Sequence, residues 1–354
     1  MRKPFLILII VVSMMKFVTS YRFLVSQLRP RILSPRFSTQ QEIFQLPENT
    51  PFTVRQAYLK GMQWLKDHGI AEPEVSAKLL LCRLKEVGMY RDSHFKSCLG
   101  KSLSPESILF YNKMVTERGT SKPTQYIIGN WDFYGKEFIC REPVLIPRPE
   151  TEELVENILK SVQLLQKNIT ILDIGCGSGI IGITLCDQLQ NVSQVVSIDI
   201  SEAAQKLTTE NANNILSKEK RDKFHCFQCD FESLLSKYPQ FCGAFDLIVS
   251  NPPYISSNQI PTLDKEVRLF EDHRALDGGK DGLDLTRKII ETAPKLFKEN
   301  GLKTLWLELS NEHPSLLKNE LIKRRQQDLS CPIESIESYQ DYSTFDRFAR
   351  IHFK

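Results

Sequence analysis

The chain has 354 residues, a length that suits two domains with an ample hydrophobic core. Its composition, 41% hydrophobic and 25% charged, is that of a soluble globular protein and excludes a largely disordered or collagen-like chain. The formal net charge of +3 is unevenly spread: residues 1–41 hold seven basic residues and no acid, so the remainder has 39 basic and 43 acidic residues, a net of −4. Such a body has no general attraction for nucleic-acid backbones.

The first residues form a targeting segment in our interpretation. Residues 5–15, FLILIIVVSMM, are apolar apart from Ser13, but as a helix they would span about 16 Å, against about 30 Å for a membrane core. We therefore expect no stable membrane insertion. A secretory signal and a mitochondrial presequence both remain open, and the acid-free, Arg- and Ser-containing character of residues 17–41 favours the presequence. We assign residues 1–46 to this segment and expect a mitochondrial matrix protein.

The cysteines also indicate a reducing compartment. There are nine, an odd number, and they show no disulfide-scaffold pattern. Cys226 and Cys229 have the spacing of zinc ligands, but a closed zinc site needs four ligands and no second pair has that spacing. We interpret the two as strand cysteines and expect no metal.

Residues 47–130 are predicted to form a small helical domain. A helix start signal, Asn49-Thr50-Pro51, precedes apolar residues at spacings of three and four, and Gly69 would end that helix. A second helix is predicted over 73–88 and a third over 105–118. No catalytic cluster is visible, so packing and partner docking both remain open as roles.

Residues 131–142 resemble two short strands around Gly135, a hairpin that links the two domains. After it, Pro147 and Pro149 hold Arg148 extended, and acidic residues crowd the first turn of a following helix, where they suit the positive end of its dipole.

From residue 143 to 354 we expect an α/β domain. Strand-like segments alternate with helical ones such as 202–216 and 283–299. This rhythm predicts βαβ units and a mostly parallel, Rossmann-like sheet with helices on both faces. The strand-like segments are ITILDIG, QVVSIDI, KFHCFQCD, FDLIVSN, KTLWLEL and RFARIHF.

A glycine loop follows the first of these strands. Gly175, Gly177 and Gly179 in the stretch GCGSG allow a tight turn and close approach of a ligand. A dinucleotide fingerprint would place its third glycine at position 180, which is Ile180, and no Walker-type Lys-Ser/Thr follows. The loop therefore suits a nucleoside without a pyrophosphate.

Acids end the next two strands. Asp199 could accept hydrogen bonds from both ribose hydroxyls, although a helix N-cap formed by Asp199 or Ser201 is the alternative. Asp230 and Phe231 could hold an adenine through its amine and its face, although a cap followed by a core phenylalanine would look the same.

The fourth strand ends in Asn251-Pro252-Pro253-Tyr254. The nitrogen of a planar amide or nucleobase amine is a poor nucleophile, and two acceptors, the Asn251 side-chain oxygen and the Pro252 carbonyl, could each take one of its N–H groups. The prolines fix φ and so hold these acceptors in place, and Tyr254 could stack on the flat substrate. The electrophile that suits a nucleoside without pyrophosphate is the methyl group of S-adenosylmethionine. The pattern predicts in-line methyl transfer driven by positioning.

The chain resembles the release-factor glutamine methyltransferases, the HemK/PrmC family. LDIGCGSG, SIDIS and SNPPY are typical of class I S-adenosylmethionine-dependent methyltransferases, and QYIIGNWDFYGKEF, LIPRPETEELV and EVRLFEDHRALDGGKDGLDL narrow the resemblance. It implies a seven-stranded sheet and N5-methylation of the glutamine in the Gly-Gly-Gln motif of peptide-chain release factors. With the leader, the chain resembles the mitochondrial branch, whose partners would be mitochondrial release factors.

The resemblance also implies site roles. Gly175, Cys176, Gly177, Ser178, Gly179 and Asp199 would bind the cofactor together with Asp230, Phe231 and Asn251, and residues 251–254 would bind the target glutamine. Asn251, Pro252 and Tyr254 would be catalytic, and the helical domain would dock on the release factor. Two departures stand out: Phe270-Glu271-Asp272-His273 replaces an aromatic-Glu-Pro run, and Phe231 stands where bacterial members often have Trp.

Two other functions remain open. An adenine-N6 or cytosine-N4 methyltransferase acting on RNA or DNA could use the same tetrapeptide, but its flipped base would need a basic channel. A cofactor-binding regulatory protein without turnover is disfavoured by the intact Asn251 and Tyr254. We expect a monomer with no direct nucleic-acid partner.

Overall fold

The computed structural model describes residues 51–354 except 89–90, 164 and 329. The predicted targeting segment, residues 1–46, lies outside this range. Within the described part, no helix combines the length and the apolar character needed to cross a membrane.

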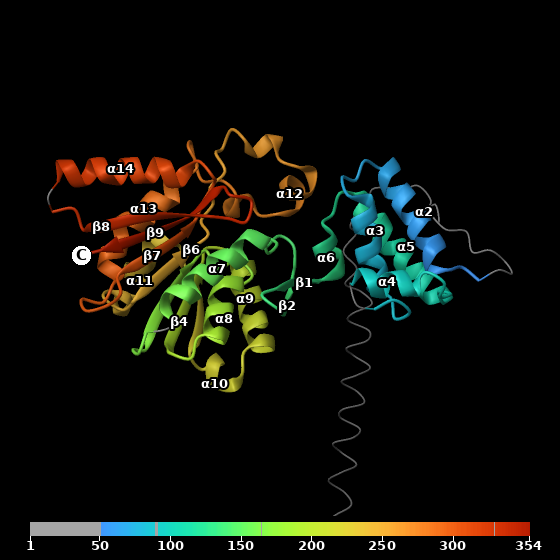
Figure 1. The fold of residues 1–354 in the computed structure, drawn as a ribbon, viewed down its shortest axis with the longest axis horizontal. Coiled ribbons are helices and arrows are strands. Elements are labelled where there is room, and N and C mark those ends of the chain that lie inside the picture. Colours follow the sequence, from blue (N-terminus) through green and yellow to red (C-terminus); the bar gives the residue numbers. More distant parts are fainter. Residues whose placement is uncertain (1–50, 89–90, 164, 329) are drawn as a thin grey trace, which may run out of the picture. The chain divides into compact units, whose positions relative to one another are not determined.

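Within the described residues, five helices precede the first strand (Figure 1). A capping box starts α2, because the Thr53 hydroxyl accepts a hydrogen bond from the Gln56 N–H at 3.3 Å and the Gln56 side chain accepts one from the Thr53 N–H at 2.8 Å. The expected start at Asn49-Thr50-Pro51 was therefore a few residues early. The helices are α2 (Val54–Asp67), α3 (Pro73–Leu81), α4 (Asp92–Cys98), α5 (Pro105–Gly119) and α6 (Thr124–Ile128).

These helices share a hydrophobic core. Leu65, Leu80 and Tyr111 are among its fully buried side chains. The helix predicted over 73–88 ends at Leu81, and α4 was not predicted, because its seven residues carry too short an apolar pattern to show a helical period. The helix predicted over 105–118 is confirmed as α5.

A two-stranded antiparallel hairpin follows, as the sequence predicted. Strand β1 (Asn130–Phe133) pairs with β2 (Lys136–Ile139) across a turn in which Gly135 has a φ of 73°. Arg148 is extended, with φ −101° and ψ 141°, and Pro149 is the first residue of the next helix, α7 (Pro149–Val162), whose first turn carries Glu150 and Glu152.

The rest of the chain is a class I S-adenosylmethionine-dependent methyltransferase fold. Its seven-stranded sheet has the order β5-β4-β3-β6-β7-β9-β8, in which the first five are parallel and β9 is antiparallel to both neighbours. The strands are β3 (Ile169–Ile174), β4 (Val192–Asp199), β5 (Phe224–Gln228), β6 (Leu247–Ser250), β7 (Thr304–Glu308), β8 (Ile333–Gln340) and β9 (Asp346–Phe353). The prediction of a mostly parallel sheet is confirmed.

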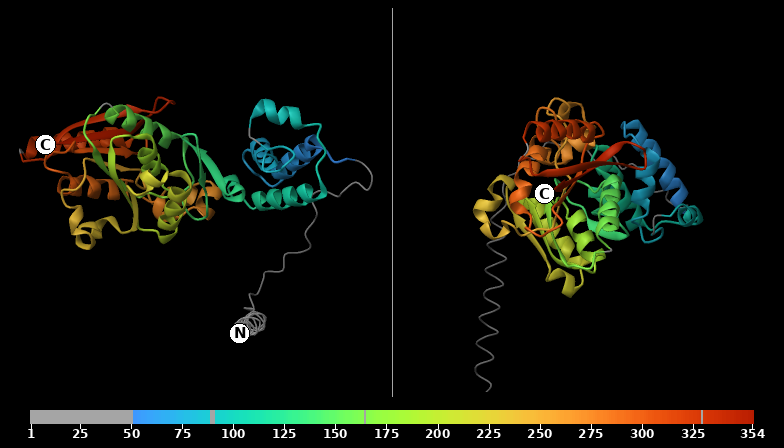
Figure 2. Two further views of the ribbon diagram at one scale, coloured as in Figure 1. Left: turned by 90° about the horizontal axis from the view of Figure 1, so that it is seen from below. Right: turned by 60° about the vertical axis from the view of Figure 1, so that its left-hand side comes forward.

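Two layers of helices cover the sheet (Figures 1 and 2). Alternate residues of β3 show this directly, because Ile171 belongs to one apolar cluster and Leu172 to the other. The first cluster includes residues of α7, α8 (Ile180–Gln188) and α9 (Glu202–Ile215), and the second includes residues of α13 (Asp284–Leu296) and α14 (His313–Gln327).

Short elements fill the connections. They are α10 (Lys218–Arg221), α11 (Leu234–Lys237), α12 (Lys265–Phe270) and four single-turn 3₁₀ helices, η1 (Phe231–Ser233), η2 (Pro239–Phe241), η3 (Ile260–Thr262) and η4 (His273–Ala275). Among the strands of the described residues, only β8 was not recognised individually. Its sequence, IESIESYQ, has an apolar residue at every third position and neither an apolar run nor an alternating pattern, and the strand lies at the edge of the sheet.

Candidate active site

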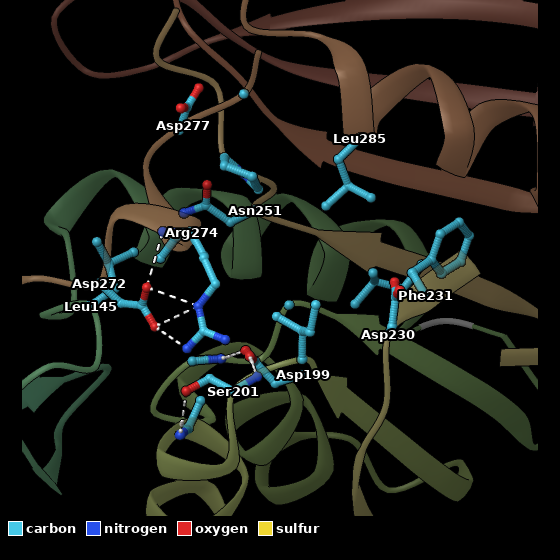
Figure 3. A pocket seen from close by; sticks show the side chains of 18 of the residues that line it. Leu145, Asp199, Ser201, Asp230, Phe231, Asn251, Asp272, Arg274, Asp277 and Leu285 are labelled. Atoms are coloured by element: carbon cyan, nitrogen blue, oxygen red, sulfur yellow. Dashed lines mark hydrogen bonds and ion pairs between the residues drawn. The ribbon is translucent and has the colours of Figure 1, made fainter. Parts of the chain in front are cut away.

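A cavity of about 470 Å³ opens where the parallel strands end. Its walls come from the residues that follow β3, β4, β5 and β6, and from the segment between β6 and α13 (Figure 3). This is the edge at which open α/β sheets bind ligands. Among the predicted site residues, those that line it are Gly175, Gly177, Asp199, Asp230, Phe231, Asn251 and Pro253.

The glycine loop adopts a backbone that side chains disfavour. Gly175, Gly177 and Gly179 have φ values of 72°, 57° and 86°, all in the left-handed region. A Cβ built on Gly177 would meet no atom within 4 Å, whereas one on Gly179 would lie 2.6 Å from the Ile183 Cδ1 atom. Gly177 therefore leaves open space at the cavity wall, and Gly179 allows the start of α8 to pack closely.

Asp199, the last residue of β4, is fixed by the loops around it. Its Oδ2 accepts a hydrogen bond from the Gly177 N–H at 2.9 Å, and its Oδ1 accepts one from the Ser201 N–H at 2.8 Å. Burial raises the pKa of Asp199 above its ordinary value, and these two N–H groups act in the opposite direction. The N-cap of α9 is Ser201, not Asp199, so the capping alternative does not account for this acid.

Asp230 and Phe231 form the cap and the core contact that the sequence offered as the alternative, and both also lie on the cavity wall. The Asp230 carboxylate caps η1 by accepting the Glu232 N–H at 3.1 Å, and Phe231 is 6% exposed in the apolar core. On that wall, Ile200 and Leu285 add apolar surface. This part of the wall could take the flat face of a nucleobase.

Asn251 stands at the end of β6, beside the glycine loop. Strand β6 pairs in parallel with β3 on one side and β7 on the other, which brings Asn251 next to both Gly175 and the end of β7. Its Nδ2 group donates to the Thr151 hydroxyl at 3.4 Å, and its side chain lies on the cavity wall (Figure 3).

Five predicted site residues do not line the cavity: Cys176, Ser178, Gly179, Pro252 and Tyr254. Cys176 is buried, with its Sγ 3.4 Å from the Thr208 Oγ1 atom, and the Ser178 carbonyl accepts the Asn211 side-chain N–H at 2.9 Å. Pro252 is buried as well. Cys176 and Ser178 therefore support the glycine loop from the side away from the cavity.

Tyr254 lies among charged groups at the end of β7. Burial and the neighbouring Glu308 carboxylate raise the pKa of Tyr254 to about 12, with Arg347 opposing them. Its phenol stays protonated and neutral near pH 7.

One pair of wall residues was missed from the sequence. Asp272 binds the Arg274 guanidinium through both carboxylate oxygens, with a shortest distance of 2.6 Å, and Arg274 reaches toward Asp199 (Figure 3). The sequence feature that could have indicated this pair is the run Phe270-Glu271-Asp272-His273, which departs from the family's aromatic-Glu-Pro pattern. There, Glu271 is buried and forms an ion pair with Arg148 at 2.7 Å.

The residues present fit S-adenosylmethionine. The cavity volume is within the range of about 300–1,000 Å³ found for small-molecule sites. Gly177 leaves room for a ligand to approach the backbone closely, and the Asp199 carboxylate at the end of β4 could accept hydrogen bonds from the ribose hydroxyls. The apolar wall could hold the adenine. Within the described part of the chain, no group of histidine, cysteine or acidic side chains is arranged to hold a metal ion.

Two family models match parts of this chain. Residues 165–303 match the family described as Methyltransferase domain, and residues 56–129 match the PrmC N-terminal domain. Among solved structures, a ribosomal protein L11 methylase from Lactobacillus delbrueckii subsp. bulgaricus superposes with a TM-score of 0.38 at 17% identity, over 63% of this chain and 90% of that one. We base no conclusion on so low a score.

Curated relatives share one description. The human MTRF1L release factor glutamine methyltransferase is 38% identical over 63% of this chain and 66% of its own length. The release factor glutamine methyltransferase of Geobacter sulfurreducens is 34% identical over 71% of this chain and 82% of its own, and that of Clostridium botulinum 33% identical over 78% and 94%. The chain therefore belongs to the release factor glutamine methyltransferase family.

Proposed function

We propose that this protein methylates the N5 atom of the glutamine in the Gly-Gly-Gln motif of peptide-chain release factors, with S-adenosylmethionine as methyl donor. The observation that carries the proposal is the shared cavity: the glycine loop, Asp199 and Asn251 lie on its walls. Family membership supports the same substrate.

Specific residues would hold the cofactor. The amino-acid portion would lie against the loop from Gly175 to Gly179, and the ribose would bind Asp199. The adenine would lie against Asp230 and Phe231. When bound, S-adenosylmethionine supplies an electrophilic methyl group on a sulfonium. The chain's own part is to orient the acceptor nitrogen toward that group and to exclude water.

Asn251 and Pro252 orient the glutamine. The Asn251 Oδ1 atom and the Pro252 carbonyl each accept one N–H of the target amide, which directs the nitrogen and fixes its plane. Tyr254, which lies near Glu308 and does not line the cavity, would support residues 251–253 from behind. No strong base is required, because an N-methylated, protonated amide is acidic and releases its proton readily. Positioning supplies most of the rate, as in other oriented bimolecular reactions.

We further propose that the substrate is a mitochondrial release factor. The support is the acid-free leader of residues 1–41, with seven basic residues. Expression of the full chain with a fluorescent tag at its C-terminus, beside a version that lacks residues 1–46, tests this: the full chain should enter mitochondria and the shortened one should not.

Mass spectrometry of release-factor peptides tests the main proposal. The purified protein is incubated with labelled S-adenosylmethionine and a release factor, or with RNA or DNA, and the products are digested. We expect a gain of one methyl group on the Gly-Gly-Gln peptide and none in a Gly-Gly-Glu substrate. Label only in nucleic acid would favour an adenine-N6 or cytosine-N4 methyltransferase, and no transfer to any substrate would reject the proposal.

A further inference from the structure

Glu308 is a buried carboxylate beside the site that the proposed reaction does not use. It is the last residue of β7 and is 1% exposed. Because Ser250 of β6 is paired with Leu307 of β7, the next residues in register are Asn251 and Glu308. The carboxylate therefore sits at the sheet edge directly beside the amide that binds the target glutamine in our proposal.

The surroundings of Glu308 do not balance its charge fully. The Thr151 hydroxyl, the Arg347 guanidinium and the Asn251 side chain favour its ionised form, while Glu150 repels it. Its Oε2 atom finds no hydrogen-bond partner in the part of the chain that is described. Burial raises the pKa of Glu308 to about 7, from an ordinary 4.5. A carboxylate kept under these conditions destabilises the fold, which is consistent with a role at the site.

Thr151 joins Glu308 to Asn251. It is 1% exposed in the first turn of α7, and its Oγ1 atom accepts the Asn251 Nδ2 group at 3.4 Å. The Thr151 hydroxyl lowers the pKa of Glu308, so it favours the ionised form, and toward an ionised carboxylate, which can only accept hydrogen bonds, it acts as a donor. Its lone pairs then face Asn251 and can take only an N–H group.

The contact with Thr151 fixes the orientation of the Asn251 carboxamide. An asparagine side chain presents either its oxygen or its nitrogen in a given direction, and the hydrogen-bond network around it decides which. With Nδ2 held by the Thr151 hydroxyl, the polar atom that Asn251 can present to the cavity is Oδ1. A flipped Asn251 would present N–H groups to the N–H groups of the target amide.

We propose that Glu308 and Thr151 are positioning residues that hold the Asn251 carboxamide with its oxygen toward the substrate nitrogen. This inference rests on the proposed function, since it assigns a role within the same methyl transfer. The two residues do not touch the reacting atoms and act through Asn251 alone.

Two matched pairs of variants test it, measured as single-turnover transfer to a release factor with both substrates saturating. Thr151→Val removes the hydroxyl but keeps the shape, and Thr151→Ser keeps the hydroxyl. Glu308→Leu removes the acceptor, and Glu308→Gln keeps a carbonyl acceptor for Thr151. We expect about tenfold or greater loss of rate for Val and Leu, and recovery to within about threefold of wild type for Ser and Gln, as for loss of a charge-assisted hydrogen bond.

Cofactor affinity by calorimetry and melting temperature separate positioning from folding. Under the proposal all four variants bind S-adenosylmethionine as wild type does. The combined Thr151→Val, Glu308→Leu protein loses less than the product of the two single losses, because both changes break one relay. Wild-type rates in the Val and Leu variants, or rates that follow the melting temperature in all four, would overturn the inference. Failure of wild type itself to methylate the glutamine would instead reject the proposed function.

Discussion

The Asp199 carboxylate accepts the backbone N–H of Gly177 at 2.9 Å, so the acid at the end of β4 and the glycine loop after β3 form one unit. The loop turns back toward the neighbouring strand, and its second glycine contacts the acid that we assign to the ribose. A substitution at either residue should therefore change the affinity for the cofactor.

Asp199→Ala should weaken cofactor binding more than it slows the chemical step. Charge-assisted hydrogen bonds of the kind that a carboxylate makes to ribose hydroxyls are worth about 1.5–3 kcal/mol, which is about a 10- to 100-fold change in affinity. Calorimetry with S-adenosylmethionine measures it, with Asp222→Ala, an exposed acid away from the cavity, as the control. Equal affinity of the Asp199 variant and wild type would exclude the ribose role.

Asn251→Ala should act on the transition state instead. Removing a positioned hydrogen-bonding group costs about 3–4 kcal/mol in comparable sites, or a rate loss of about 10²–10³-fold. Single-turnover methyl transfer measures the loss, and calorimetry should show cofactor affinity little changed. Asn258→Ala, an exposed amide on the same loop that does not line the cavity, is the matched control. Turnover near wild type in the Asn251 variant would mean that its oxygen does not orient the substrate.

Two glycines of one loop should respond differently to alanine. Both have positive φ, so each substitution carries a backbone cost of about 1 kcal/mol. In Gly179→Ala the new Cβ also lies 2.6 Å from Ile183 Cδ1 and 2.9 Å from Thr208 Cγ2, so we expect a further loss of about 1–3 kcal/mol in unfolding free energy. Gly177→Ala meets no such contact and should instead weaken cofactor binding, since it fills cavity space. Denaturant unfolding and calorimetry distinguish them, and equal destabilisation would contradict the assignment.

Much of this site could be predicted from sequence because its residues follow apolar strands. Runs such as Ile171–Ile174 and Leu247–Ser250 place the next residue at the carboxyl edge of a parallel sheet, and the glycine loop, Asp199 and Asn251 all have that position. These residues lie at the same edge of the sheet whatever the order of the strands, so their proximity can be predicted without knowing that order.

Residues that depend on pairing or on loop path could not be predicted in this way. Glu308 looks like the last residue of another apolar strand, and only the register of β6 with β7 brings it beside Asn251. Arg274 depends on the path of a segment without periodicity, whose ends are held by a bridge between Ile255 and Asp277. Tyr254 was predicted from local sequence to face the substrate, but the structure places its ring near Glu308, outside the cavity wall.

Buried carboxylates should make the fold less stable as pH rises. Burial raises the pKa of Asp173 to about 7 from an ordinary 3.8, although Ser197 and the Gly182 N–H donate to its Oδ2 atom at 3.1 Å. Between these two pKa values the folded protein holds a proton that the unfolded chain has lost. The free energy of unfolding therefore falls as pH rises toward 7 and levels off above it.

Asp173→Asn isolates this contribution. Asparagine keeps the acceptor oxygen for Ser197 and Gly182 but cannot ionise, so the part of the pH dependence due to Asp173 disappears. Between about pH 5.5 and pH 8 the variant should lose about 2 kcal/mol less unfolding free energy than wild type. The difference between the two proteins matters, because buried His313, whose pKa is lowered, acts in the opposite direction in both. Urea unfolding at the two pH values measures it, and parallel pH profiles for the two proteins would show that Asp173 stays ionised in the native state.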